Sequence, residues 1–115
     1  MGAVATIGID LAKNAIHVHG VDAQGTPVLR RKVPRREVGM VFTNLPPCVV
    51  GLEAGRGAHH CARELIKLGH SVKLMPPQYV KPYVKTNKND AVDAEAICEA
   101  VRRPTMRFVP VKTLD

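Results

Sequence analysis

The chain has 115 residues with a formal net charge of +7, and 45% of its residues are hydrophobic. This length supports one domain with a modest hydrophobic core, and the excess of cations favours polyanionic partners, nucleic acid and acidic membrane surfaces above all. The three cysteines have no CxxC spacing, so we exclude a disulfide framework and a zinc ribbon. No uninterrupted apolar stretch is long enough to cross a bilayer, so we exclude a membrane protein and expect a cytoplasmic protein.

Three extended segments come first along the chain. Residues 4–10 form an apolar, β-branched run typical of a buried strand, and residues 14–21 alternate between apolar and polar side chains. Residues 26–33 follow the turn-forming sequence DAQG. We expect these segments to form an antiparallel meander.

Helical and extended segments alternate in the rest of the chain. The apolar spacing predicts helices over residues 38–45, 57–69 and 90–103, with strands over residues 48–54 and 71–75. A parallel strand needs a helical crossover, which this order provides. The order therefore predicts an α/β fold, a five-stranded mixed sheet with an antiparallel three-strand meander and flanking helices. The final sequence, MRFVPVKTLD, is compatible with a linker.

Four carboxylates stand out by their position in these elements. Asp10 ends the first strand and Glu53 lies near the end of the fourth, so both emerge at one edge if these strands are parallel neighbours. Asp90 and Asp93, three residues apart at the start of the last helix, share one helical face. Carboxylates that converge repel one another unless hard cations bind them. The pattern predicts Mg²⁺ or Mn²⁺, with two ions about 3.5–4 Å apart as the arrangement that cleaves phosphodiesters.

Simpler roles explain the same acids one at a time. Asp90 is a candidate helix cap, and Asp93 in the first turn interacts favourably with the helix dipole. Asp10 is a candidate turn residue, and Glu53 a candidate partner of Arg56. The position of two acids at strand ends, where α/β proteins place ligands, favours the metal site.

A basic stretch with interleaved tyrosines, PPQYVKPYVKTNK, precedes the last helix. Lysines neutralise phosphates and tyrosines offer stacking surfaces for bases, although solvated lysines beside half-buried tyrosines produce the same pattern. A second basic cluster, over residues 30–36, is either another nucleic-acid surface or a strand edge protected by charge. The candidate nucleic-acid contacts are Lys13, Arg56, Tyr79, Lys81, Tyr83, Lys85 and Lys88.

The histidines and the serine suggest no second site. His59 and His60 are adjacent on a helix and diverge by about 100°, so they cannot converge on one ion. His17 and His19 fit the hairpin surface or local packing. The only serine, Ser71, has no identifiable base partner, which argues against a serine nucleophile within this chain.

The segments IGIDLAKN and NKNDAVDAEAI, the run PPQYVKPYVK and the spacing between them resemble a known family. The chain is similar over nearly its whole length to the N-terminal domain of insertion-sequence-110 family transposases, relatives of pilin-gene inverting recombinases. This resemblance implies a RuvC-like domain of ribonuclease H fold. Its acidic tetrad, Asp-Glu-Asp-Asp (DEDD), would map onto Asp10, Glu53, Asp90 and Asp93.

The resemblance also implies a function. Family members are recombinases that excise and insert mobile DNA, guided by a structured RNA, and assemble as homo-oligomers on DNA. They carry a C-terminal domain with a serine nucleophile, so we expect residues 1–115 to be a single RuvC-like domain from a longer protein, not recombining alone. Arg56 departs from the family pattern, and its cation either competes with metal near Glu53 or contacts DNA.

Our leading hypothesis is therefore metal-dependent processing of DNA strands in transposition. An alternative is one lobe of an actin-like or sugar-kinase-like ATPase, although LAKN replaces the Gly, Thr or Ser that such phosphate loops offer. A further alternative is a non-catalytic nucleic-acid-binding module that keeps the fold and the basic surface.

Overall fold

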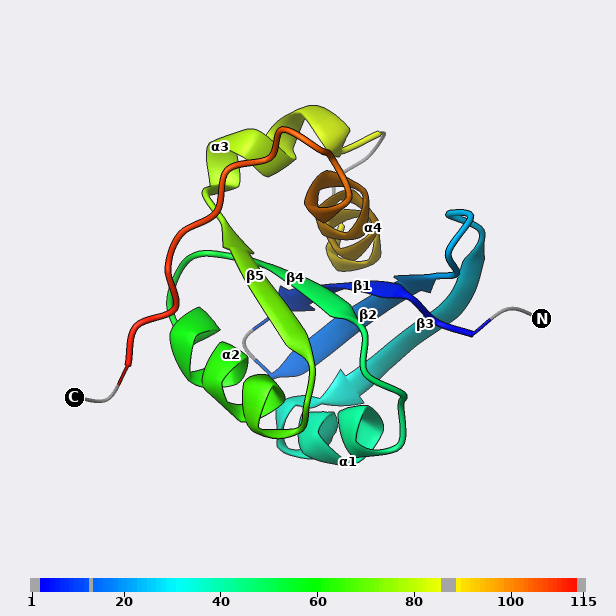
Figure 1. Cartoon of the computed structure of the whole chain (residues 1–115), viewed down its shortest axis with the longest axis vertical. Helices are drawn as coiled ribbons and strands as arrows, with labels where there is room; N and C mark the ends of the chain where they lie inside the picture. The colour runs from blue at the N-terminus through cyan, green and yellow to red at the C-terminus, as the bar shows by residue number, and fades with distance from the viewer. Residues whose placement is uncertain (1–2, 13, 86–88, 114–115) are drawn as a thin grey trace.

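The computed structural model describes residues 3–12, 14–85 and 89–113, and its centre is a five-stranded mixed sheet (Figure 1). The strands are β1 (Thr6–Leu11), β2 (Ala15–Val21), β3 (Pro27–Pro34), β4 (Val49–Glu53) and β5 (Ser71–Met75). They lie in the order β3-β2-β1-β4-β5. The first three pair antiparallel, whereas β4 pairs in parallel with β1 and with β5. The predicted mixed sheet with its meander is confirmed.

Helices cover both faces of the sheet. The helical segments are η1 (Arg35–Glu37), α1 (Val38–Thr43), α2 (Ala58–Lys67), α3 (Pro77–Val80), η2 (Lys81–Tyr83) and α4 (Asp90–Val101). Helices α1 and α2 lie on one face, and α3 and α4 lie on the other (Figure 1). Within the described ranges no helix is long and apolar enough to span a bilayer.

The short segments α3 and η2 are not predicted by apolar spacing. Each has a proline in its first turn, Pro77 in α3 and Pro82 in η2, where the missing N–H costs no helical hydrogen bond. Both segments pack against α4. They therefore carry the tyrosines of the basic stretch onto the α4 face of the sheet.

Two glycines let α4 lie directly on the sheet. Gly8 of β1 is paired in register with Gly51 of β4. A Cβ at Gly8 would overlap backbone atoms of Ala94 and Cys98, and one at Gly51 would lie 2.8 Å from Cβ of Val101. The helix backbone thus approaches β1 as closely as the absence of a side chain allows. This contact sets the distance between α4 and the sheet, and therefore the position of the first turn of α4 relative to the strand ends.

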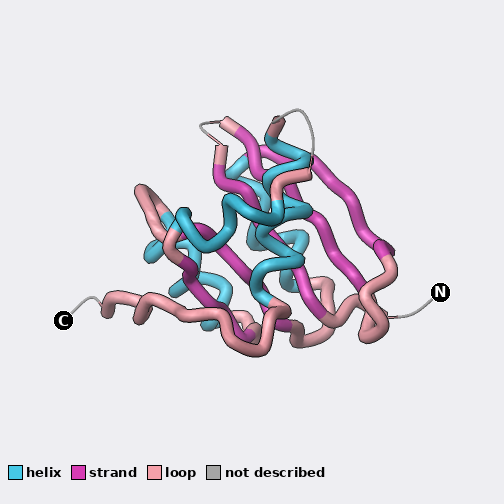
Figure 2. Tube along the Cα trace, turned by 90° about the horizontal axis from the view of Figure 1, so that it is seen from above, coloured by secondary structure: helices cyan, strands magenta, loops and turns pink. Residues whose placement is uncertain are grey.

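The C-terminal segment, residues 104–113, lies along the outer edge of β5 (Figures 1 and 2). The Val109 N–H donates to the Leu74 carbonyl oxygen at 2.8 Å. Farther on, the Lys112 N–H donates to His59 Nδ1 at 2.9 Å, and the Arg63 guanidinium donates to the Lys112 carbonyl at 2.7 Å. The segment thus packs on the domain and shields an edge strand.

Candidate metal centre

The parallel pairing of β1 and β4 sets the first part of the site. Ile9 lies opposite Leu52 in this pair, so Asp10 and Glu53 follow at the same end of the two strands. Asp10 is half-buried there. Both carboxyl groups therefore emerge at the carboxyl edge of the parallel strands, the usual ligand edge of α/β sheets.

The first turn of α4 supplies the second part. Asp90 is its first residue and Asp93 lies one turn on. The helix cap is Asn89, whose side chain accepts a hydrogen bond from the Val92 N–H at 2.9 Å. The alternative in which Asp90 serves as the helix cap is therefore wrong, because Asn89 occupies the cap position. The Asp90 carboxylate does not cap the helix.

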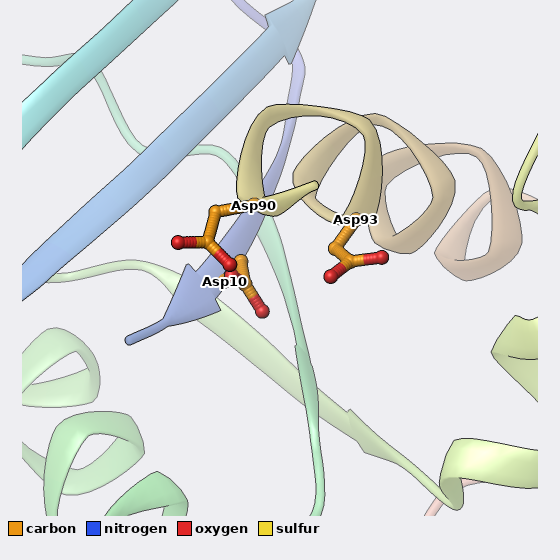
Figure 3. Close-up of side chains that lie close together, drawn as sticks. All are labelled: Asp10, Asp90 and Asp93. Atoms are coloured by element: carbon orange, nitrogen blue, oxygen red, sulfur yellow. The ribbon is translucent and has the colours of Figure 1, made fainter. Parts of the chain in front are cut away.

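Three carboxylates meet where these elements join. Asp10, Asp90 and Asp93 each offer an oxygen, and these oxygens all lie within 4.8 Å of one another. Figure 3 shows Asp10 at the end of β1, facing the two aspartates that descend from the first turn of α4. Among the described residues, the cluster comprises these three aspartates and does not include Glu53. Oxygen donors of this kind suit hard divalent cations.

Burial and the neighbouring acids both change the ionisation of Asp10. The pKa of Asp10 is raised from its ordinary value of 3.8 to about 7, first because burial penalises the charged form, and then because of the nearby charges of Asp90, Asp93 and Glu53. A hydrogen bond with Asp90 also favours protonated Asp10. Glu53 is thus near enough to act on Asp10 electrostatically. Burial and the neighbouring carboxylates therefore both favour the protonated form of Asp10.

His17 also borders the cluster, although the sequence suggests only a surface or packing role for it. It lies directly opposite Asp10 in the β1–β2 pair, and its Nε2 is 3.6 Å from Asp90 Oδ2. The His17 side chain is 17% exposed and that of Asp90 52% exposed. The alternation of strand residues, combined with the hairpin register, is the signal that could have placed His17 on the same face as Asp10.

The candidate nucleic-acid contacts lie in different surroundings. Tyr79 is 41% exposed on α3, and Lys81 is exposed on η2. Tyr83 is half-buried and packs against the apolar cluster beneath α4. Lys85 Nζ lies 3.3 Å from Glu99 Oε2 and 3.9 Å from Glu95 Oε2, so carboxylates already neutralise this cation.

Of the three remaining candidates, Arg56, Lys13 and Lys88, the structure describes only Arg56. Arg56 is exposed in the turn between β4 and α2, three residues after Glu53. Lys13 and Lys88 lie outside the described residues. The exposed candidates are therefore Arg56, Tyr79 and Lys81, together with Lys85 in its ion pairs.

Residues 7–115 match the insertion-sequence-110 DEDD family, whose members are described as transposases. The chain belongs to this transposase family. Over 112 residues, 97% of the chain, it is 54% identical to the y4pF/y4sB protein of Sinorhizobium fredii. Over the same share of the chain it is 49% identical to the transposase for insertion sequence element IS1328 of Yersinia enterocolitica and 40% identical to that for IS1111A of Coxiella burnetii.

The matched region is a part of each relative. It makes up 29%, 34% and 31% of the lengths of these three proteins, so the chain spans about a third of the curated relatives that it matches. The resemblance expected from the sequence motifs is confirmed, as is the α/β fold that it implies. Membership of this family argues against the alternative of an ATPase lobe.

Proposed function

We propose that this chain is the N-terminal, RuvC-like domain of a transposase, and that it processes DNA strands with divalent metal ions. The observation that carries the proposal is the cluster of Asp10, Asp90 and Asp93, whose oxygens lie within 4.8 Å of one another. Membership of a transposase family supplies the context. Asp10, Glu53, Asp90 and Asp93 are the proposed catalytic tetrad.

The residues of the cluster fit Mg²⁺ or Mn²⁺. All of its donors are carboxylates, which these ions prefer to the thiolate and imidazole ligands of zinc sites. Burial, and then the neighbouring carboxylates, raise the pKa of Asp10 to about 7, and a bound cation would favour its ionised form instead. The chemistry that a bound pair of ions supplies is activation of an attacking oxygen and stabilisation of the leaving oxygen of a phosphodiester.

The chain's own residues have separable roles in this proposal. Asp10, Asp90 and Asp93 hold the metal, with Glu53 beside Asp10 completing the negative field. Gly8 lets α4 approach β1 and thereby keeps the two parts of the site together. The proposed nucleic-acid contacts are Lys13, Arg56, Tyr79, Lys81, Tyr83, Lys85 and Lys88.

The wider activity belongs to a longer protein in this proposal. Residues 1–115 would be one domain of a homo-oligomeric recombinase that excises and inserts a mobile element under the guidance of a structured RNA. A further domain with a serine nucleophile would complete the recombination chemistry. Support for this context comes from the family, since the chain spans about a third of its relatives.

Titration of Mg²⁺ and Mn²⁺ into the 115-residue chain, followed by calorimetry and thermal unfolding, tests the proposal. A specific ion at 100 times its Kd stabilises the fold by about 2.7 kcal/mol. We expect a metal-dependent rise in Tm that Asp93→Asn abolishes and Glu64→Gln, on the opposite face of the sheet, retains. Equal shifts in both variants would contradict a metal centre at this cluster.

Repeating the titration in the presence of DNA distinguishes the proposed metal-dependent domain from the alternative of a non-catalytic nucleic-acid-binding module. A domain that processes DNA binds metal more tightly when phosphates supply further oxygen ligands. DNA binding without any metal-dependent change, and with no effect of Asp93→Asn, would instead indicate a non-catalytic nucleic-acid module.

A further inference from the structure

The few aromatic residues of this chain are unevenly distributed. It contains two tyrosines, two phenylalanines and no tryptophan. Phe42 is fully buried, whereas Tyr79 is 41% and Phe108 43% exposed, and Tyr83 is half-buried. Exposed rings mark a candidate interaction surface when they lie together in one patch.

A hollow of about 280 Å³ lies between two segments that are distant in the sequence. One side comes from α3 and η2, the other from the turns that follow α4. The residues that line it are Gln78, Tyr79, Pro82, Tyr83, Arg103 and Thr105–Arg107. The base of the hollow is well packed, because Tyr83 and Met106 lie against the apolar cluster beneath α4. The hollow is close to the lower end of ligand sites, about 300 Å³.

Phe108 extends this surface along the edge of the sheet. Successive residues of an extended segment point to opposite sides. Val109 packs against the core on the α1 and α2 side, so Phe108 points to the side of α3 and α4. There the Lys73 Nζ lies 5.6 Å from the centroid of the Phe108 ring. The C-terminal segment thus contributes a second exposed ring, with a cation beside it.

The charge of the surface has one sign. Arg103 and Arg107 are exposed in the hollow, and neither forms an ion pair with any residue in the described ranges. The residues that line the hollow include no acid. On the other flank of η2 the situation differs, because Lys85 is paired with Glu95 and Glu99. The two unpaired arginines of the hollow therefore lie on the same side of the domain as the exposed rings.

We propose that this surface, formed by Tyr79, Tyr83, Arg103, Arg107 and Phe108, binds unpaired nucleotides of a single-stranded nucleic acid. Bases stack on aromatic rings whatever their identity, and guanidinium groups pair with the phosphates between them. In a duplex the bases are already stacked on each other and unavailable to Tyr79 or Phe108. The surface extends the contacts proposed for Tyr79 and Tyr83 above, but does not depend on the metal centre.

Fluorescence anisotropy with labelled single strands of about 12 nucleotides, within the site sizes of known single-strand binders, measures this binding. We expect Tyr79→Ala and Phe108→Ala each to weaken binding by about 5- to 150-fold, the range for loss of one stacked base. Tyr79→Phe should restore the affinity, because the ring is kept. Arg107→Gln should lower the log–log salt slope by about 0.7 for a lost phosphate contact.

Matched controls exclude general effects. Met40→Ala removes another exposed apolar side chain, 68% exposed on α1 across the sheet, and should leave binding unchanged. An abasic strand of the same length carries the same charge and should bind less tightly. Because the chain has no tryptophan, its emission comes from two tyrosines, and stacking should quench it.

Two results would overturn the proposal. One is equal affinity of wild type for the base-containing and abasic strands, and the other is equal affinity of Tyr79→Ala and wild type for the single strand. The surface would then be a contact for protein. Failure of the metal centre is distinguishable, because it appears as loss of the Mn²⁺-dependent rise in Tm rather than as a change in single-strand affinity.

Discussion

His17 lies directly opposite Asp10 in the β1–β2 pair, and its Nε2 is 3.6 Å from the Asp90 carboxylate of α4. One side chain thus connects the hairpin to the helix that carries two of the clustered acids. The Asp90 side chain is half-exposed and hydrogen-bonds to Asp10, and the nearby imidazole of His17 further restricts the positions that its carboxylate can take. His17 is therefore in a position to orient the proposed metal ligand Asp90.

Replacement of His17 by alanine tests this orienting role. Loss of a residue that orients a metal ligand typically weakens metal affinity by about 10- to 100-fold. We expect the lower end of that range for Mn²⁺, measured by calorimetry, with a small change in Tm for the metal-free protein. Lys32→Gln, directly across from His17 on β3, is the matched control and should retain Mn²⁺ affinity. Unchanged Mn²⁺ affinity in His17→Ala would assign His17 to packing alone.

The protonation of Asp10 predicts how stability depends on pH. Its pKa in the folded protein is about 7, whereas the pKa of the carboxyl group in the unfolded chain is about 3.9. The favourable contribution of the protonated form is complete below the unfolded pKa and is lost as pH rises through about 7. We therefore expect Asp10→Asn, relative to wild type, to become increasingly stable between pH 4 and 7 in the absence of metal.

Thermal unfolding of both proteins across this pH range gives the comparison. Addition of Mn²⁺ should reverse the order at pH 7.5, because the ion stabilises the ionised wild-type cluster and Asp10→Asn removes one ligand. Glu64→Gln on α2 should follow the wild-type curve. A constant difference in Tm between Asp10→Asn and wild type would contradict the raised pKa.

The contact between α4 and the sheet predicts a steric effect at Gly8. A methyl group there meets the backbone of Ala94 and Cys98, which cannot move aside as a flexible side chain can. Overpacking of a core typically costs about 1–3 kcal/mol, and we expect Gly8→Ala to lower the free energy of unfolding by that amount. It should also weaken Mn²⁺ binding, because α4 must move away from Asp10.

A glycine elsewhere in the chain provides the control. A Cβ at Gly39, in α1, meets nothing within 4 Å. Alanine is the better helix former by about 1 kcal/mol, so Gly39→Ala should stabilise the protein and leave Mn²⁺ affinity unchanged. Chemical denaturation with urea measures both variants. Stabilisation by Gly8→Ala would show that α4 is not held against β1 as described.

Much of the fold could be predicted from the sequence, because apolar patterns report local structure. Residues 71–75 are a strand of the predicted length, and Gly69, directly after the Leu68 C-cap of α2, has a φ of +97°, a conformation that favours glycine at a helix end. The placement of α3 and η2 is less accessible, because prolines at their starts interrupt the apolar periodicity. The packing of the C-terminal segment on β5 is a tertiary contact, with no local signal of its own.

The candidate site also has residues whose positions follow from local sequence patterns and a contact that does not. Asp10 and Glu53 stand at the ends of apolar strands, and Asp90 and Asp93 share a helix face, so their positions follow from local patterns and the parallel pairing. The contact of His17 with Asp90 is different. It requires the hairpin register and the docking of α4 on Gly8 together, and neither is visible in a single segment.

The cap of α4 predicts a final effect on the site. Asn89 accepts a hydrogen bond from the Val92 N–H and so fixes the turn that carries Asp90 and Asp93. Replacement of such a cap by alanine costs about 1 kcal/mol, typically by fraying of the first turn. We expect Asn89→Ala to lower Tm and to weaken Mn²⁺ binding, whereas Asn89→Ser, which keeps an acceptor, should do neither to a large extent. Asn44→Ala, at the end of α1, is the control for loss of an exposed amide and should retain Mn²⁺ affinity. If Asn89→Ala lowered Tm but left Mn²⁺ affinity intact, the geometry of the carboxylates would not depend on the first turn of α4.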